Sequence, residues 1–268
     1  MGSSPRPAGA GADLLGEVTA ADVAARVRDT LEGVFDAVRE IRDDAAALLT
    51  AVSASGRQPV TTDLAELRPG LHTRLTRLEL VSGAGFVAAP ALLADVPAWL
   101  EWWQIGAGGE VRPLLLDLDP AHSAYSDYTH WDWFALARDT GRRAVAGPYV
   151  DYLCSDEYSL TLSVPVTVDG RFMGVAAADV YLSHFEAAVM PVMQRLPAPA
   201  LLVNARGRVA ASTCADHLTG ALFKGPDFGA VPAGPADGVE YGGRRLRPCG
   251  DTPLILVTTP GDEGHPGA

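Results

Sequence analysis

The sequence predicts an α+β fold in which one long N-terminal helix is followed by two antiparallel sheet modules. Apolar residues recur every three or four positions over residues 19–52, which is the period of a helix. Two strand-like runs, 159–168 and 171–180, flank the pair Asp169-Gly170. Asp-Gly between two β-prone runs is a strong hairpin signal, because both turn positions need a positive φ. The same pattern of strand, glycine-closed turn and strand returns in weaker form at 196–213.

These observations divide the chain into five segments. They are a disordered tail (1–18), the long helix (19–56), a larger module that binds a ligand (57–195), a smaller second module (196–260) and a C-terminal tail (261–268).

The long helix has clear start and stop signals. Thr19 with Asp22 three residues later forms a capping pattern, and Ser55-Gly56 ends the apolar period. About 34 residues at about 1.5 Å each give a helix roughly 50 Å long. That is long for a small domain, so we expect its exposed part to form a homodimer or partner contact.

Shorter elements follow in the larger module. A short helix is predicted at 57–78, interrupted by Pro69-Gly70. We then expect a strand at 80–90, a passage from helix to strand at 91–105 and another strand at 111–119. After the central hairpin, Ser183 and Glu186 have the spacing of a capping box for a helix at 183–196.

The second module is predicted as a smaller copy of the first, without tryptophan. Its hairpin turns at 204–207, a short helix follows at 216–223, and two strands are expected at 238–248 and 253–259.

Composition excludes several classes of protein. The 268 residues are 48% hydrophobic and 20% charged, which is ordinary for a globular protein. The net charge of −12 argues against nucleic-acid binding, which needs a basic face. The N-terminus has no apolar signal-peptide core, and no apolar run approaches the roughly 18 residues of a membrane span. Three widely spaced cysteines suit a reducing compartment, so we expect a cytoplasmic protein without membrane contact.

Aromatic and acidic residues concentrate between positions 125 and 181, which hold six of the seven tyrosines. The last residue of interest there is Asp179, which closes a mostly apolar strand. A carboxylate in such a place is costly to bury without a partner. One explanation is a ligand ammonium, and the other is a cap on the helix that begins near Ser183.

The order WDWFALARDTG, then GPYVDY, then a hairpin ending in GVAAADV resembles the membrane-distal module of double Cache (dCache, PAS-like) sensor domains. The resemblance implies a long stalk helix beside two PAS/Cache-like modules. It also implies a ligand site that includes Trp133-Phe134, Tyr149 and Asp179. The arginine that the family places two positions before the tryptophan corresponds to Trp131, which removes the usual partner of a carboxylate.

We therefore expect a small-molecule sensor that binds a cationic amine or an amino-acid-like ligand. Aromatic faces attract cations, and a buried carboxylate forms a strong charge-assisted bond with an ammonium. The candidate ligand-binding residues are Tyr125, Tyr128, Trp131, Trp133, Phe134, Tyr149, Asp151 and Asp179. Trp102 and Trp103 lie outside this motif and are expected in the core, and Cys154 is expected as an inert wall of the site.

Two alternatives stay open at this point: an enzyme using the same pocket, and a dimeric structural protein with a degenerate pocket. The sequence has no G-x-S-x-G, H-E-x-x-H or P-loop motif. Asp127, His130, Asp132 and Asp151 lack the spacing of a known metal site. We accordingly expect no catalysis, no metal and no cofactor.

Overall fold

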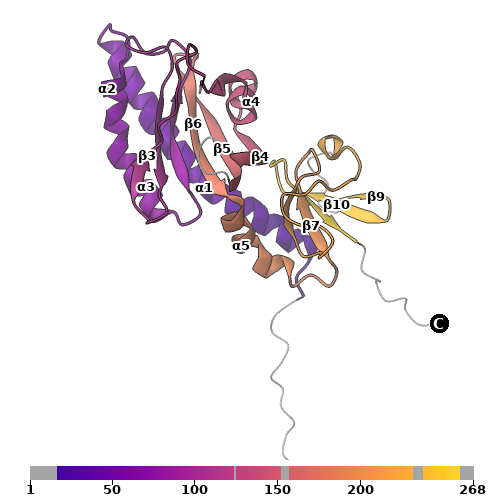
Figure 1. Cartoon of the computed structure of the whole chain (residues 1–268). Coiled ribbons are helices and arrows are strands. Elements are labelled where there is room, and N and C mark those ends of the chain that lie inside the picture. Colours follow the sequence, from indigo (N-terminus) through magenta and orange to yellow (C-terminus); the bar gives the residue numbers. More distant parts are fainter. Residues whose placement is uncertain (1–16, 124, 152–156, 232–237, 260–268) are drawn as a thin grey trace, which may run out of the picture.

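The computed structural model describes residues 17–123, 125–151, 157–231 and 238–259. One long helix is followed by a six-stranded and a five-stranded antiparallel sheet, which confirms the predicted fold class (Figure 1). The larger module lies at one end of the long helix and the smaller module at the other. The predicted tails, 1–18 and 261–268, lie outside the described residues apart from residues 17 and 18. In the described part of the chain, no helix combines the length and apolarity that a membrane crossing requires.

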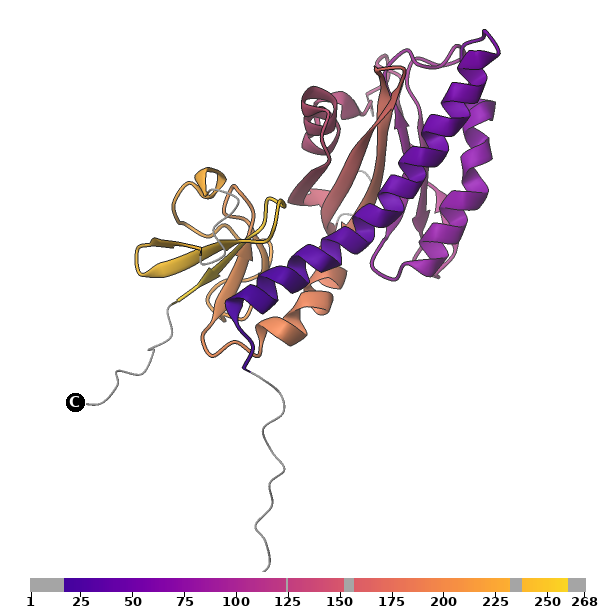
Figure 2. The same ribbon diagram turned by 180° about the vertical axis from the view of Figure 1, so that it is seen from behind.

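The long helix, α1 (Ala20–Ala54), begins as the sequence predicts. The Thr19 hydroxyl accepts a hydrogen bond from the Asp22 amide, and the Asp22 carboxylate accepts one from the Thr19 amide. Seen from behind, the helix runs across the larger module, and its N-terminal end lies beside the smaller module (Figure 2). Its apolar face is buried within the chain, with Leu31, Ile41 and Leu49 fully covered. Packing against two modules therefore explains both its length and its apolar face, and the dimer contact stays a prediction.

The six strands of the first sheet lie in the order β3-β2-β1-β6-β5-β4. Their bounds are β1 (Gly83–Ala88), β2 (Leu100–Ile105), β3 (Val111–Pro113), β4 (Ala144–Asp151), β5 (Glu157–Val168) and β6 (Arg171–Tyr181). The hairpin β5–β6 turns at Asp169 and Gly170, both with positive φ, as the sequence predicts. The stretch 91–99 contains no helix, and the strand expected at 111–119 ends at Pro113.

Side chains alternate along each strand, so successive residues lie on opposite faces of this sheet. Different helices pack against the two faces. Phe86, Leu160 and Leu162 belong to one face and pack in the core that includes α1. Val87, Val175 and Ala177 belong to the other face and pack with residues of α4 (Asp132–Thr140). The second face holds the candidate site.

Two helix boundaries differ from prediction. Pro69 does not interrupt a helix but stands in the first turn of α3 (Arg68–Arg77), after α2 (Thr61–Leu64) and a short 3₁₀ turn, η1 (Ala65–Leu67). Proline is tolerated there because the first amides of a helix have no intrahelical acceptor. The capping box at Ser183 is wrong: α5 (Leu182–Met193) starts directly after β6, with Tyr181 as the cap residue.

The second sheet has the order β8-β7-β11-β10-β9. Its strands are β7 (Ala200–Val203), β8 (Val209–Ser212), β9 (Val239–Tyr241), β10 (Arg244–Pro248) and β11 (Ile255–Thr258). The single strand expected at 238–248 is a hairpin, because Gly242 and Gly243 adopt positive φ. The prediction of a helix at 216–223 is also wrong. In this segment the backbone amides of Gly220 and Phe223 donate to the carbonyls of Val209 and Gly207, not to carbonyls one helical turn earlier.

Arg143 connects the two modules with the long helix. Its guanidinium donates to the carboxylates of Glu32 on α1 (2.9 Å) and Asp251 in the second module (2.7 Å). It also lies over the ring of Phe35, 4.4 Å from the ring centroid. The ion pairs lower the pKa values of Glu32 and Asp251 and raise that of Arg143.

Replacement of Arg143 tests whether its contacts stabilise the packing of α1 against the two modules. We expect Arg143→Met to lower the free energy of unfolding by about 1–3 kcal/mol, the usual worth of hydrogen bonds to charged groups. The two carboxylates have lowered pKa values in the folded chain, so their contribution is present at neutral pH and is lost as the pH falls below about 4. Urea unfolding at two pH values measures both effects. The exposed neighbour Arg142, changed to Met, is the control, and equal stability of the two variants would contradict the role of Arg143.

Candidate ligand-binding site

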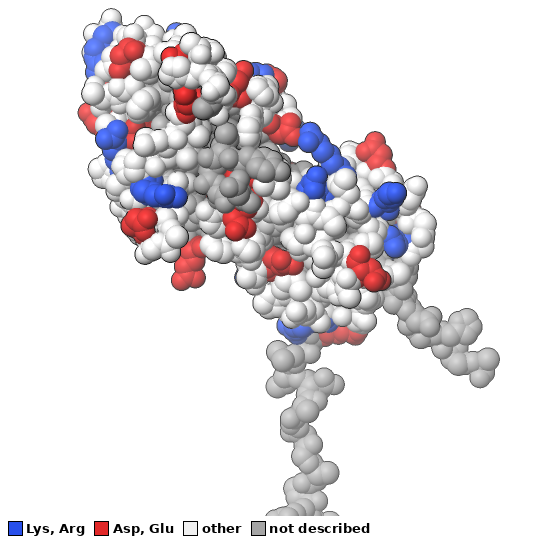
Figure 3. Space-filling model, in the orientation of Figure 1, with Lys and Arg blue, Asp and Glu red and all other residues white. Residues whose placement is uncertain are grey.

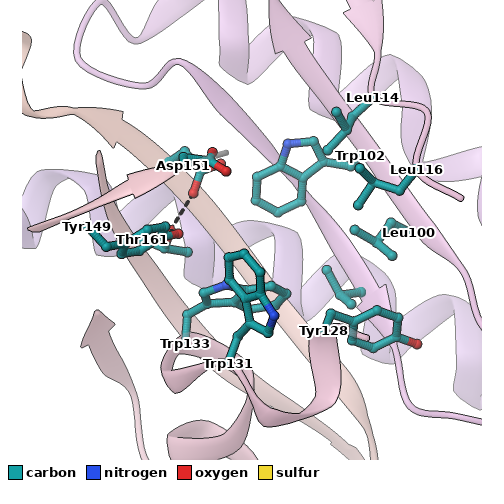
Figure 4. A pocket seen from close by; sticks show the side chains of 12 residues that line it. Leu100, Trp102, Leu114, Leu116, Tyr128, Trp131, Trp133, Tyr149, Asp151 and Thr161 are labelled. Atoms are coloured by element: carbon teal, nitrogen blue, oxygen red, sulfur yellow. Dashed lines mark hydrogen bonds between the residues drawn. The ribbon is translucent and has the colours of Figure 1, made fainter. Parts of the chain in front are cut away.

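A small cavity of about 30 Å³ lies between the second face of the first sheet and the segment that leads into α4. Figure 4 shows the indoles of Trp102, Trp131 and Trp133 around the cavity, with Asp151 and Thr161 on one side and three leucines on the other. The lining residues are Val87, Leu100, Trp102, Leu114, Leu116, Tyr128, Trp131, Trp133, Tyr149, Asp151, Thr161 and Asp179.

Strand alternation brings the polar residues of this wall together. Tyr149 and Asp151 are two apart on β4 and therefore share a face. Thr161 on β5 pairs directly with Asp179 on β6. On the other side of β6, the partner of Asp179 is Gly83 of β1, which has no side chain to occupy the cavity.

Asp179 is the most perturbed acid of this wall. Its side chain is almost fully buried and accepts a hydrogen bond of 2.6 Å from the Thr161 hydroxyl, which in turn contacts the Tyr149 hydroxyl. Burial, with a smaller contribution from the nearby carboxyl of Asp151, raises the pKa of Asp179 to about 8, although the hydrogen bond from Thr161 opposes the shift. Asp151 is also buried. Among the described lining residues there is no lysine, arginine or histidine.

The geometry separates the two explanations of Asp179 that the sequence leaves open. The α5 helix is preceded by Tyr181, and no side chain caps its start. The Asp179 carboxylate instead bonds Thr161 on the neighbouring strand and borders the cavity. A helix cap therefore does not account for this carboxylate.

The aromatic wall is fixed by hydrogen bonds to the sheet. The Ser163 hydroxyl donates to the carbonyl of Trp133 (2.6 Å), and the Tyr128 hydroxyl donates to the carbonyl of Ala88 (2.8 Å). Trp131 meets Tyr149 edge to face, with ring centroids 6.2 Å apart. Burial raises the pKa of Tyr128 to about 12, so this tyrosine stays a neutral hydrogen-bond donor.

Two predicted site residues do not line the cavity. Phe134 is fully buried beneath it, where it contacts Tyr128, Trp133 and Phe172 edge to face. It faces the core because α4 turns it by about 100° from Trp133. Tyr125 is 41% exposed, in the irregular segment before α4. Cys154 lies outside the described residues.

The structure adds lining residues that the sequence did not indicate, above all Trp102. Trp102 and Trp103 are neighbours on β2, so their side chains lie on opposite faces of the sheet. Trp103 donates its indole N–H to Glu101, in the wall that faces α3, whereas Trp102 borders the cavity. The signal that could have found Trp102 is the alternation of side chains along a strand. Once LEWWQI is assigned as a strand, Trp102 and Trp103 must lie on opposite faces.

The four residues considered as metal ligands lie in different elements of the fold: Asp127 caps and His130 ends the short 3₁₀ turn η2 (Tyr128–His130), Asp132 begins α4, and Asp151 ends β4 in the cavity wall. Asp127 accepts hydrogen bonds from the amide and hydroxyl of Thr129, and the His130 ring lies 3.4 Å from Asp127. Asp132 pairs with Arg206 of the second module. Within the described chain, no group of three or more His, Cys, Asp or Glu side chains has a metal-binding arrangement.

Comparison with known proteins supports the fold of the first module. Residues 116–187 match the family model of the first PDC sensor domain of methyl-accepting chemotaxis protein-like proteins. These residues contain most of the aromatic wall and the β5–β6 hairpin. No sequence among the curated proteins matches this chain.

Solved structures share the fold at low sequence identity. A methyl-accepting chemotaxis protein X is 18% identical with a TM-score of 0.53, covering 86% of this chain and 98% of its own. The ligand-binding domain of the Pseudomonas aeruginosa amino acid chemoreceptor PctC, in complex with GABA, has the same identity and TM-score and covers 88% and 93%. The ligand-binding domain of the Campylobacter jejuni chemoreceptor Tlp3, with L-norvaline, is 15% identical, has a TM-score of 0.55 and covers 89% and 87%.

The raised pKa of Asp179 predicts how stability depends on pH. The folded chain holds a proton on Asp179 up to about pH 8, whereas an unfolded aspartate releases it near pH 4. The folded state therefore binds more protons between these values, and stability falls as the pH rises through this window. We expect Asp179→Asn to raise the melting temperature at pH 8 and to change it little at pH 4.

Asp169 provides a matched control for that experiment. It is exposed in the β5–β6 turn with a φ of 50°, a conformation that asparagine also accepts. Asp169→Asn should shift the melting temperature equally at both pH values. Destabilisation by Asp179→Asn at pH 8 would mean that the ionised carboxylate supports the fold.

Proposed function

We propose that this chain, which has the fold of double Cache sensor domains, is a sensor module that binds a small cationic amine in the cavity of its larger module. One observation carries the proposal: the buried carboxyl of Asp179 borders an aromatic surface, and the described lining residues include no cationic side chain. A ligand ammonium would supply a positive charge beside Asp179. The matched family is a family of sensors, which favours ligand binding over catalysis.

The aromatic residues add to the attraction for a cation. A cation over the face of a tryptophan or tyrosine gains about 0.5–2 kcal/mol, and more when water is excluded. Trp131, Trp133 and Tyr149 lie around the same space as the carboxyls. Removing an ammonium from water costs free energy. That cost is offset only if the ammonium contacts both the aromatic rings and a carboxylate.

An amine fits this cavity better than a free amino acid does. The relatives in complex with GABA and L-norvaline bind ligands that carry both an ammonium and a carboxylate. A ligand carboxylate needs a cationic or strongly donating partner, and arginine is the usual one. In this chain Trp131 stands where the family has that arginine, and Asp151 and Asp179 would repel a second negative charge.

Transmission of the signal is part of the proposal. The cavity wall includes the start of α4, and the turn after α4 carries Arg143, which contacts both α1 and the second module. A displacement of α4 by the ligand would therefore reach both elements. A partner or second copy along α1, and a cytoplasmic location, remain predictions from the sequence. The scattering mass in solution tests the first of them.

Proton release tests the amine site. If an ammonium takes the place of the proton on Asp179, affinity for a primary amine should rise by up to about tenfold per pH unit from pH 6 to pH 8 and then level off. Asp179→Asn should weaken binding at pH 8 by at least about thirtyfold, because a buried charge pair is lost. Calorimetry with short primary amines in two buffers of different ionisation enthalpy measures affinity and proton release together.

Asp169→Asn is again the control and should bind like the parent. Affinity that stays constant from pH 6 to pH 8 would show that Asp179 is not the partner of the ammonium. Unchanged binding by Asp179→Asn would place the ligand elsewhere in the molecule.

A further inference from the structure

The indole N–H of Trp102 is a buried hydrogen-bond donor without an acceptor. Its side chain is 95% buried, and its nitrogen has no partner in the described chain. Of the side-chain atoms in this condition among the described residues, it is the one on a residue that lines the cavity. Buried donors are normally paired, so an unpaired one at a binding site needs an explanation.

Neighbouring tryptophans show the ordinary arrangement. The indole N–H groups of Trp99 and Trp103 both donate to the carboxylate of Glu101, at 3.3 and 2.8 Å. Glu101 therefore supplies an acceptor to the tryptophans on either side of Trp102, whereas the Trp102 nitrogen has none in the described chain.

On the premise that the proposed amine site is correct, we infer that its ligand also carries an uncharged hydrogen-bond acceptor, which takes the N–H of Trp102. The ligand class is then a short amine with a hydroxyl, ether or amide oxygen. Trp102 acts as the residue that distinguishes such a ligand from a plain amine and from an amino acid.

The sheet register places this donor near Asp179. A Cβ atom on Gly83 would lie 2.9 Å from the Trp102 nitrogen, so the indole covers the position that a side chain of residue 83 would occupy. Gly83 is also the direct strand partner of Asp179. Cβ positions of directly paired residues are about 5 Å apart, so the Trp102 nitrogen and the Asp179 Cβ are within about 8 Å of each other. An ammonium and an acceptor joined by two or three carbon atoms can reach both groups.

Charge decides what kind of acceptor is bound. A carboxylate is the strongest acceptor, but here it would enter a wall that holds Asp151 and Asp179 and, in its described part, no cation. A neutral indole N–H does not neutralise a negative charge. A hydroxyl or amide oxygen accepts the same bond without that repulsion.

Three matched probes test the inference: 3-amino-1-propanol, n-butylamine and β-alanine. They share a short chain and a primary ammonium, and they end in a hydroxyl, a methyl and a carboxylate. We expect the parent to bind 3-amino-1-propanol about fivefold to tenfold more tightly than n-butylamine, the usual worth of one hydrogen bond. β-Alanine should bind most weakly. Trp102→Phe keeps an aromatic ring but removes the N–H, so it should abolish the preference for the hydroxyl, and the ratio of the two affinities should fall to about one.

Trp103→Phe is the matched control. It removes an indole N–H from the adjacent residue, on the opposite face of the sheet, and should keep the preference for the hydroxyl. Calorimetry at millimolar probe concentration, with melting temperatures to verify folding, gives the comparison. A preference that survives in Trp102→Phe, or an equal loss for both amines, would overturn the inference while leaving the amine site intact. Absence of binding by all three probes to the parent would overturn the amine site and the inference together.

Discussion

The pairing of β5 with β6 is the constraint on which the rest of the structure depends. Both strands are largely buried on both faces: one set of side chains packs in the core beside α1, and the other set packs against α4 and borders the cavity. A shift of one residue in this pairing would exchange the two sets and place Leu160 and Leu162 in the cavity. The Asp169-Gly170 turn fixes the register, and the register in turn places Thr161 opposite Asp179. The chemistry of the cavity thus follows from the geometry of one hairpin.

Much of the fold was predictable because its signals are local. The capping residues and apolar period define α1, and the turn chemistry defines the central hairpin. The errors occurred where tertiary contacts override local preference. Residues 216–223 have a helix-like composition, yet their amides bond the end of β8 and the turn before it. Ser183 and Glu186 have the spacing of a cap, yet β6 leads directly into α5 and leaves no residue for one.

The candidate site was predictable only in part, for a similar reason. Six of the eight residues expected there line the cavity, because they follow a motif carried by one stretch of chain. Trp102, Leu114 and Leu116 come from β2 and the segment after β3, and only the pairing of β1 with both β2 and β6 brings them to the same face. The burial and raised pKa of Asp179 likewise depend on neighbours distant in sequence. The face in Figure 3 mixes acidic and basic groups without a continuous basic stripe, as the composition indicates.

Two parts of the cavity wall differ in the backbone hydrogen bonds that hold them in place. Asp179 and Thr161 stand on central strands with hydrogen bonds on both sides. Leu114 and Leu116 belong to a segment outside the sheet, tied back by bonds from the Leu114 amide to Trp102 and from the Ser126 amide to Asp117. Local opening requires less free energy where few backbone bonds must break. For the proposed ligand, we therefore expect the rates of entry and exit to depend on this leucine segment and selectivity to depend on the strands.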